Sequence, residues 1–286
     1  MDPAILQFLL WPIIASLVIA GIHAYLGLHV VERGVIFVDL SLAQIASLGA
    51  TLALLVPAFG GDPHSPAVYW MSLGFTFIGA AIFSLIKGQK ARIPQEAIIG
   101  ISYAVASAAV IVAMSKSTGE SEHLKDMLVG NILSVSPGEV TNTAIMYVAI
   151  GVFHYLCRRR FLLISTDPER AAAHGISIRF WDFLFYASFG VVVTRSVAIA
   201  GVLLVFCYLI VPSVGAMLFA ERIGPRLAIG WVMGVVVSML GMYFSVQFDL
   251  PTGATIVCTF GAVLILMATV RVLLPKFGVS AAREIA

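Results

Sequence analysis

Two polar side chains within one long apolar run are the residues of this sequence best suited to bind a cation. Asp39 and Gln44 both lie in the run 37–57. Carboxylate and amide oxygens can ligate metal ions, and polar groups in such runs are functional candidates because burying them in lipid is costly. Each has a structural alternative. For Asp39 it is a helix cap, which is the reading we prefer, and for Gln44 it is a hydrogen bond to a neighbouring helix.

The densest group of metal-ligand side chains lies in the polar stretch that begins at residue 115. It contains Glu120, Glu122, His123 and Asp126. Carboxylate and imidazole groups this close together could capture a transition metal, with Glu122 and His123 as ligands. The alternative, which we favour, is a solvated face that contacts a soluble protein.

Signatures of enzymes are absent from the sequence. It contains no Gly-x-x-x-x-Gly-Lys-Ser/Thr, no His-Glu-x-x-His and no Gly-x-Ser-x-Gly. Its cysteines, Cys157, Cys207 and Cys258, are far apart, which favours neither a disulfide nor a zinc site. We therefore expect no enzymatic activity and no bound cofactor in this chain.

The elements that position these residues are predicted to be membrane-spanning helices. Hydrophobic residues make up 60% of the chain and charged residues 11%, whereas a soluble domain carries about a quarter charged residues. Each helical span needs about 20 apolar residues. We predict an all-α, polytopic membrane protein that forms one domain over 1–286, without a secretory signal. About nine spans are expected, at 5–27, 37–57, 71–86, 94–114, 139–157, 180–196, 197–220, 227–248 and 251–274.

The basic residues predict how the chain is oriented in the membrane. With nine spans and a cytoplasmic loop after the fifth, all but three of the 17 lysines and arginines fall on the cytoplasmic side, the exceptions being Lys116, Lys125 and Arg195. This bias places the N-terminus outside and the C-terminus in the cytoplasm. The segment 124–133 is too short to span and is expected to form a re-entrant or surface helix on the outer side.

A polar island at 166–177 separates the fifth and sixth apolar runs. Asp167 can cap a helix, Pro168 suits the first helical position and Gly175 is a typical stop. We predict about two turns of helix across the cytoplasmic face. Such a helix could receive force from a soluble partner, and the alternative is an interfacial helix with no partner.

The island, with the pattern Asp-Pro-Glu-x-Ala-x-x-x-Gly-Ile at 167–176, resembles the coupling loop of permease subunits in ABC importers for zinc, manganese and iron. Further stretches resemble that family in the same order, so that the similarity covers most of the chain. They are Gly130-Asn-Ile-Leu-Ser-Val135, Pro212-Ser-Val-Gly-Ala216 and Asp249-Leu-Pro-Thr-Gly253, the last followed by Ala254-Thr-Ile-Val257.

This resemblance implies partners and a location. The chain would be a permease energised by a separate ATP-binding subunit, and no partner of nucleic acid is expected. It would pair with a second permease copy and receive its substrate from an extracytoplasmic binding protein, in the inner membrane of a bacterium. The loop 165–178 would dock onto the ATP-binding subunit through Asp167, Pro168, Glu169, Ala171, Ala172 and Gly175.

The sequence departs from the family at its metal-binding pair. The family's Asp-x-x-x-His falls on Leu40 and Gln44, which lie one helical turn apart. Leucine cannot ligate a metal, and an amide is a poorer ligand than imidazole for a transition metal. Asp39 is adjacent but lies about 100° away around the helix. The substrate is thus open between a divalent transition metal and a metal chelate or other solute, and a transporter driven by an ion gradient is a further alternative.

Overall fold

A computed structural model describes residues 3–56, 65–86, 93–115 and 132–273. In these ranges the chain forms α-helices and one 3₁₀ turn, with no strand. The elements are α1 (Pro3–Arg33), α2 (Val38–Leu54), α3 (Pro66–Ile86), α4 (Gln95–Met114), η2 (Ile132–Ser134), α6 (Pro137–Leu156), α7 (Arg158–Thr166), α8 (Pro168–Ala173), α9 (Ile178–Ala200), α10 (Val202–Met217), α11 (Ile223–Phe248) and α12 (Thr252–Leu273).

Each apolar run predicted as a span corresponds to one helix in the described part of the chain. Six of these helices are long and apolar enough to cross a membrane, and α6 with α7 adds a seventh if a pair bent by 73° counts as one span. With 17 and 16 residues, α2 and α10 are shorter. At 1.5 Å per residue they reach about 25 Å, against about 30 Å of hydrocarbon. The all-helical, polytopic fold is confirmed, and the count of nine spans stays a prediction.

Some predicted boundaries are wrong, for identifiable reasons. The first span was expected to end at 27, but α1 continues to Arg33, and the side chains of Glu32 and Arg33 are ion-paired to other helices. The sixth was expected to end at 196, but α9 continues to Ala200, and the break falls at Gly201 with a φ of 76°. The predicted outer helix at 124–133 lies outside the described residues apart from its last two positions, which begin η2.

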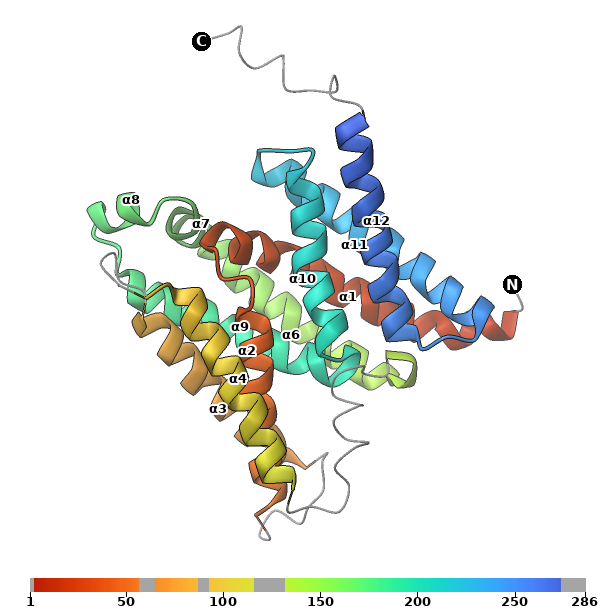
Figure 1. Cartoon of the computed structure of the whole chain (residues 1–286), viewed down its shortest axis with the longest axis horizontal. Coiled ribbons are helices and arrows are strands. Elements are labelled where there is room, and N and C mark those ends of the chain that lie inside the picture. The colour runs from red at the N-terminus through yellow and green to blue at the C-terminus, as the bar shows by residue number, and fades with distance from the viewer. Residues whose placement is uncertain (1–2, 57–64, 87–92, 116–131, 274–286) are drawn as a thin grey trace, which may run out of the picture.

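The helices pack in two groups that meet along α9 and α10. One group contains α2, α3, α4 and α9, and the other contains α1, α10, α11 and α12, with α6 packed on α1 (Figure 1). In the second group α1 and α10 approach closely at Gly27, where a Cβ atom would lie 1.9 Å from the carbonyl oxygen of Leu209. Only glycine permits this contact between the two backbones.

Large apolar side chains occur both in the core and on the outside of the molecule. Phe161, Phe185 and Tyr186 are fully buried. Val112 and Ile265, by contrast, are each 69% exposed. A water-soluble protein rarely exposes so much contiguous apolar surface, whereas lipid covers it without cost. The outer surface therefore agrees with the membrane class predicted from composition.

Candidate functional site

The polar island 166–177 contains α8, and this helix begins and ends at the capping residues predicted from the sequence. The carboxylate of Asp167 accepts a hydrogen bond from the backbone N–H of Arg170 at 2.9 Å, and Pro168 is the first helical residue. Gly175 has a φ of 73°, and its N–H donates to the carbonyl oxygen of Ala172 at 2.9 Å. The N–H of Ile176 donates to Ala171 at 3.1 Å, which completes a paired C-terminal cap. The predicted short helix and its left-handed stop are confirmed.

The residues expected to dock do not all face the same way. Ala171 is fully buried and fixes α8 to the helices of its own chain. Glu169, Ala172 and Gly175 are exposed, and Asp167 and Pro168 are half-buried. In Figure 1, α8 lies at an edge of the molecule, away from the N-terminal end. An exposed, capped helix with small side chains offers another protein a surface that needs little ordering on contact.

A buried ion pair lies at the base of the loop 165–178, and the sequence reasoning missed it. Arg33, at the end of α1, is paired with Asp182 of α9, and both side chains are fully buried. The Nε of Arg33 also donates to the hydroxyl of Ser165 in α7 at 2.8 Å. Asp182 lies in the second turn of α9, four residues after the start of that helix. An acid and a base that both interrupt apolar runs are the signal that could have paired them.

The structure places Asp39 in the first turn of α2, but not as its cap. The N-cap residue is Phe37, and no side chain caps the helix. The Asp39 side chain is buried, and its Oδ1 has no hydrogen-bond partner among the described residues. The preferred reading of Asp39 as a helix cap is therefore wrong, while its role as a ligand stays a prediction.

Gln44 is buried one turn further along α2. The side of the helix on which it lies borders a cavity further along α2. The positions 44, 47 and 51 lie on one side of a helix. Ser47 and Thr51 line a cavity of about 320 Å³ between α2, α3, α6 and α9. The polar or charged residues around it are Ser47, Thr51, Ser65, Tyr69, Ser72, Glu139, Thr194 and Arg195. This cavity could hold a small polar solute, and no sequence motif indicated it.

The charged residues at this cavity are held by neighbouring helices. The Nε of Arg195 donates to the hydroxyl of Thr143 in α6 at 3.1 Å. Glu139 accepts from the backbone N–H of Ser136 at 3.0 Å and so completes a capping box at the start of α6. The cavity is thus bordered by one guanidinium, which suits anionic or oxygen-rich groups, and by one carboxylate, which suits cations.

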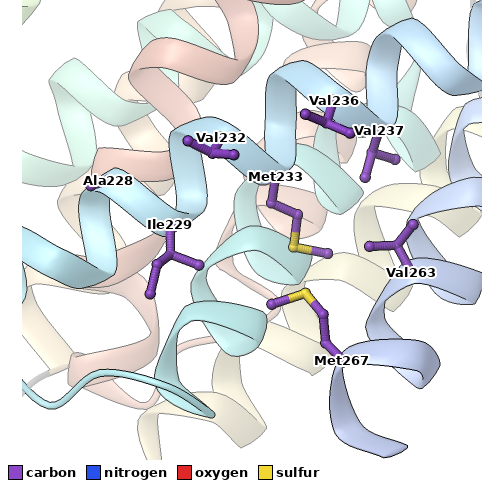
Figure 2. A pocket seen from close by; sticks show the side chains of 8 residues that line it. All are labelled: Ala228, Ile229, Val232, Met233, Val236, Val237, Val263 and Met267. Atoms are coloured by element: carbon purple, nitrogen blue, oxygen red, sulfur yellow. The ribbon is translucent and has the colours of Figure 1, made fainter. Parts of the chain in front are cut away.

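A second hollow, on the outside of α11 and α12, has a different chemistry. It measures about 380 Å³ and is lined by aliphatic side chains and two methionines (Figure 2). Figure 2 shows Met233 and Met267 pointing toward one another from these two helices. No charged group lines the hollow. It suits an acyl chain or an apolar side chain, and it does not suit a solute in transit.

The described residues do not form a conventional metal site. Among them, no group of three or more His, Cys, Asp and Glu side chains is placed to hold a metal ion. His29 and His154 lie in one aromatic cluster, with ring centroids 4.8 Å and 5.6 Å from that of Tyr25. Glu122 and His123 lie outside the described residues, and their role as ligands stays a prediction.

Comparison with known proteins gives the family. The ABC 3 transport family matches residues 5–271, nearly the whole sequence. The chain belongs to this family. The manganese transport system membrane protein MntC of Halalkalibacterium halodurans is 30% identical over 224 residues, which cover 73% of this chain and 76% of that protein. The manganese import system permease protein ScaB of Streptococcus gordonii is 26% identical over 264 residues, covering 84% and 90% of the two chains.

A solved structure supports the fold. PsaBC from Streptococcus pneumoniae in complex with Fab superimposes with a TM-score of 0.76 over 92% of both chains, at 23% identity. At that identity the likeness concerns the fold alone. Together with the family match, it confirms the resemblance seen in the motifs. This chain is a multi-pass transport protein of an ABC family, and that family is one of transporters, not of enzymes.

Proposed function

We propose that this chain is the permease subunit of an ABC importer for a divalent transition metal, and that residues 1–286 form its single transmembrane domain. A separate ATP-binding subunit would hydrolyse ATP, so this chain needs no cofactor. A second permease copy would complete the translocation path, and a soluble binding protein would deliver the substrate. The site would be the inner membrane of a bacterium, with the N-terminus outside and the C-terminus in the cytoplasm.

The observation that carries this proposal is α8. It is short, capped at both ends and exposed on Glu169 and Ala172, within a chain whose family is ABC transport. Closure of the ATP-binding subunits would push on this helix and drive alternating access of the spans. The residues Asp167, Pro168, Glu169, Ala172 and Gly175 would form or shape the docking surface, while Ala171 would hold the helix from behind. Membership of an ABC family argues against an ion-gradient-driven transporter.

A divalent metal is the favoured substrate because two relatives that match most of this chain are named as manganese transport proteins. Asp39 and Gln44 supply the buried carboxylate and the buried amide of α2, which could meet a metal in transit. The polar stretch with Glu122 and His123 would contact the soluble binding protein, and its alternative role is to capture the metal before it enters the membrane. Because imidazole is missing at position 44, a metal would be held there weakly and pass on readily.

The second candidate substrate is a metal chelate. Two observations favour it, which are the leucine at position 40 and the arginine at the cavity between α2 and α9. A chelated ion brings its own ligands and needs hydrogen bonds from the protein, which hydroxyl groups and a guanidinium supply. Bare cations would be repelled by Arg195 unless the charge of Glu139 offsets it.

Reconstituted transport tests both candidates. The permease is co-purified with its ATP-binding subunit and binding protein, placed in proteoliposomes and supplied with Mn²⁺, Zn²⁺ or Fe²⁺, each free or as a citrate complex. Uptake is measured by elemental analysis. ATP-dependent uptake of a free ion supports the first candidate, and uptake of the citrate complex alone supports the second. Uptake of neither form in the presence of ATP would contradict the proposed function. An ATP-binding subunit with its catalytic glutamate replaced is the control.

A further inference from the structure

We propose that Arg33 is the positioning residue that carries movement of the loop 165–178 to α2. The inference rests on the proposed function, because it concerns how force from the ATP-binding subunit would reach the solute path. The side chain of Arg33 is fully buried within its own chain. Its role follows from holding both ends of the loop with one side chain.

The guanidinium of Arg33 joins the two ends of the loop. Its Nε donates to the hydroxyl of Ser165, in the last turn of α7 just before α8, at 2.8 Å. Its Nη1 is ion-paired with Asp182, in the second turn of α9 just after the loop. Both charged side chains are fully buried. If α8 is displaced, the two flanks can move only together with the end of α1.

The contacts around Ser165 leave this junction little freedom. Its hydroxyl donates to the carbonyl oxygen of Phe161 at 2.8 Å and lies 2.9 Å from Nδ1 of His29. A hydroxyl has one proton and two lone pairs, so all three bonds are satisfied when Arg33 and a proton on His29 Nδ1 both donate. The ring of Phe185 lies 4.0 Å below the guanidinium and fixes its plane.

The connection from Arg33 to α2 is short. Gly34 has a φ of 66°, and its N–H donates to Val31 at 3.1 Å, while the N–H of Val35 donates to Val30 at 3.2 Å. The N–H of Phe37 is held at 3.0 Å by the carboxylate of Glu96 from α4. These hydrogen bonds hold the connection from Arg33 to α2 rigid, so a shift of Arg33 moves the start of α2. Asp39 and Gln44 follow directly on that helix.

Arginine is needed at this position because its donors form a fork. Nε and Nη1 point to different partners, whereas the ammonium of lysine is a point charge on a flexible stem. Arg33→Lys therefore keeps the charge opposite Asp182 but loses the simultaneous hold on Ser165. Ser165→Ala removes the same bond from the other side and leaves the ion pair intact. The two variants test one link by independent changes.

The test uses the full complex with its ATP-binding subunit and binding protein in proteoliposomes. The substrate is whichever of Mn²⁺, Zn²⁺ and Fe²⁺ the natural complex carries, in its free or citrate form. The amount taken up is divided by the amount of ATP hydrolysed. We expect Arg33→Lys to assemble and hydrolyse ATP but to lower uptake per ATP about tenfold, and Ser165→Ala to lower it several-fold. Glu32→Gln is the matched control, because Glu32 is the adjacent residue and is ion-paired to Arg226 and not to the loop. It should leave the ratio unchanged.

Each outcome decides the matter. An Arg33→Lys complex that assembles and keeps the natural ratio overturns the inference, while the proposed function stands. If Arg33→Lys does not assemble, Ser165→Ala decides, since an unchanged ratio overturns the inference and a lowered ratio supports it. A natural complex without ATP-driven uptake of Mn²⁺, Zn²⁺ or Fe²⁺, free or as citrate complexes, overturns the proposed function, and this inference with it.

Discussion

The two ends of α9 differ in how the protein treats charge. At one end Asp182 is sealed in an ion pair with Arg33, among buried aromatic rings. At the other end Arg195 borders a cavity of about 320 Å³ whose walls carry hydroxyl groups. The two residues are 13 positions apart, which corresponds to about 20 Å along the helix.

This contrast separates two tasks within one helix. A dry, fully paired charge resists rearrangement and so transmits displacement, because breaking it would leave an uncompensated charge in a medium of low dielectric constant. A hollow with hydroxyl walls can exchange one polar guest for another at little cost. This contrast supports the proposal that the α8 end of the molecule carries mechanical coupling and that the cavity end contacts the solute.

The largest expected effect comes from breaking the sealed pair on one side. Asp182→Ala would leave Arg33 buried without its counter-charge and should lower the free energy of unfolding by about 3–5 kcal/mol. Glu32→Ala is the matched change in a second ion pair at the same end, where the side chains of Arg226 and Glu32 are 14% and 30% exposed. It should cost below about 1 kcal/mol. Thermal and denaturant unfolding in detergent measure both, and equal costs would contradict the contrast.

The next effect concerns α8. Gly175 has a φ of 73° and an open surrounding in which a Cβ atom would meet nothing within 4 Å. Gly175→Val should therefore act by backbone strain alone, on the order of 1–3 kcal/mol, and unwind the cap of α8. We expect ATP hydrolysis to persist while uptake falls.

Two companion variants separate strain from surface. Ala172→Asp changes the exposed face of α8 without strain and should also uncouple hydrolysis from uptake, because it places a charge on the docking surface. Gly138→Val is the control, because this glycine at the cavity end is equally open and has an ordinary φ. Normal coupling in both α8 variants would show that α8 does not dock.

Much of the α8 end could be predicted from the sequence, because its signals are local. Asp167, Pro168 and Gly175 act within a few residues of themselves, so their order along the chain is enough to place the caps. The ion pair between Arg33 and Asp182 joins positions 149 apart in sequence. The residues next to either one do not indicate which residue it pairs with. The cavity has the same character, since its wall is assembled from four helices. Sequence patterns over a few residues cannot predict a site whose residues are brought together only when distant helices pack.

A smaller effect is expected on α2, between the two ends. Gln44→Ala should lower uptake more than Leu40→Ala, because only the amide offers a hydrogen-bonding group, and its loss is expected to cost about 1 kcal/mol, or about fivefold. Restoring the family's pair with Leu40→Asp plus Gln44→His should create a tighter metal site. Elemental analysis of the purified permease measures it, with each single substitution as control. Normal uptake by Gln44→Ala, together with no metal on the restored pair, would remove both positions from the solute path.

The smallest perturbation tests the orientation on which the contrast depends. Single cysteines replace His174, exposed beside α8, and Gly138, exposed at the start of α6, in a chain whose three native cysteines are serine or alanine. Both sites are open, so neither change should alter stability or uptake. In intact cells a membrane-impermeant maleimide should label Gly138→Cys alone, and His174→Cys should react only after the membrane is opened. The excess of basic residues on the α8 side predicts this result. Labelling of both cysteines from the same side would place α8 and the cavity on one face of the membrane, and the division into a coupling end and a solute end would then be wrong.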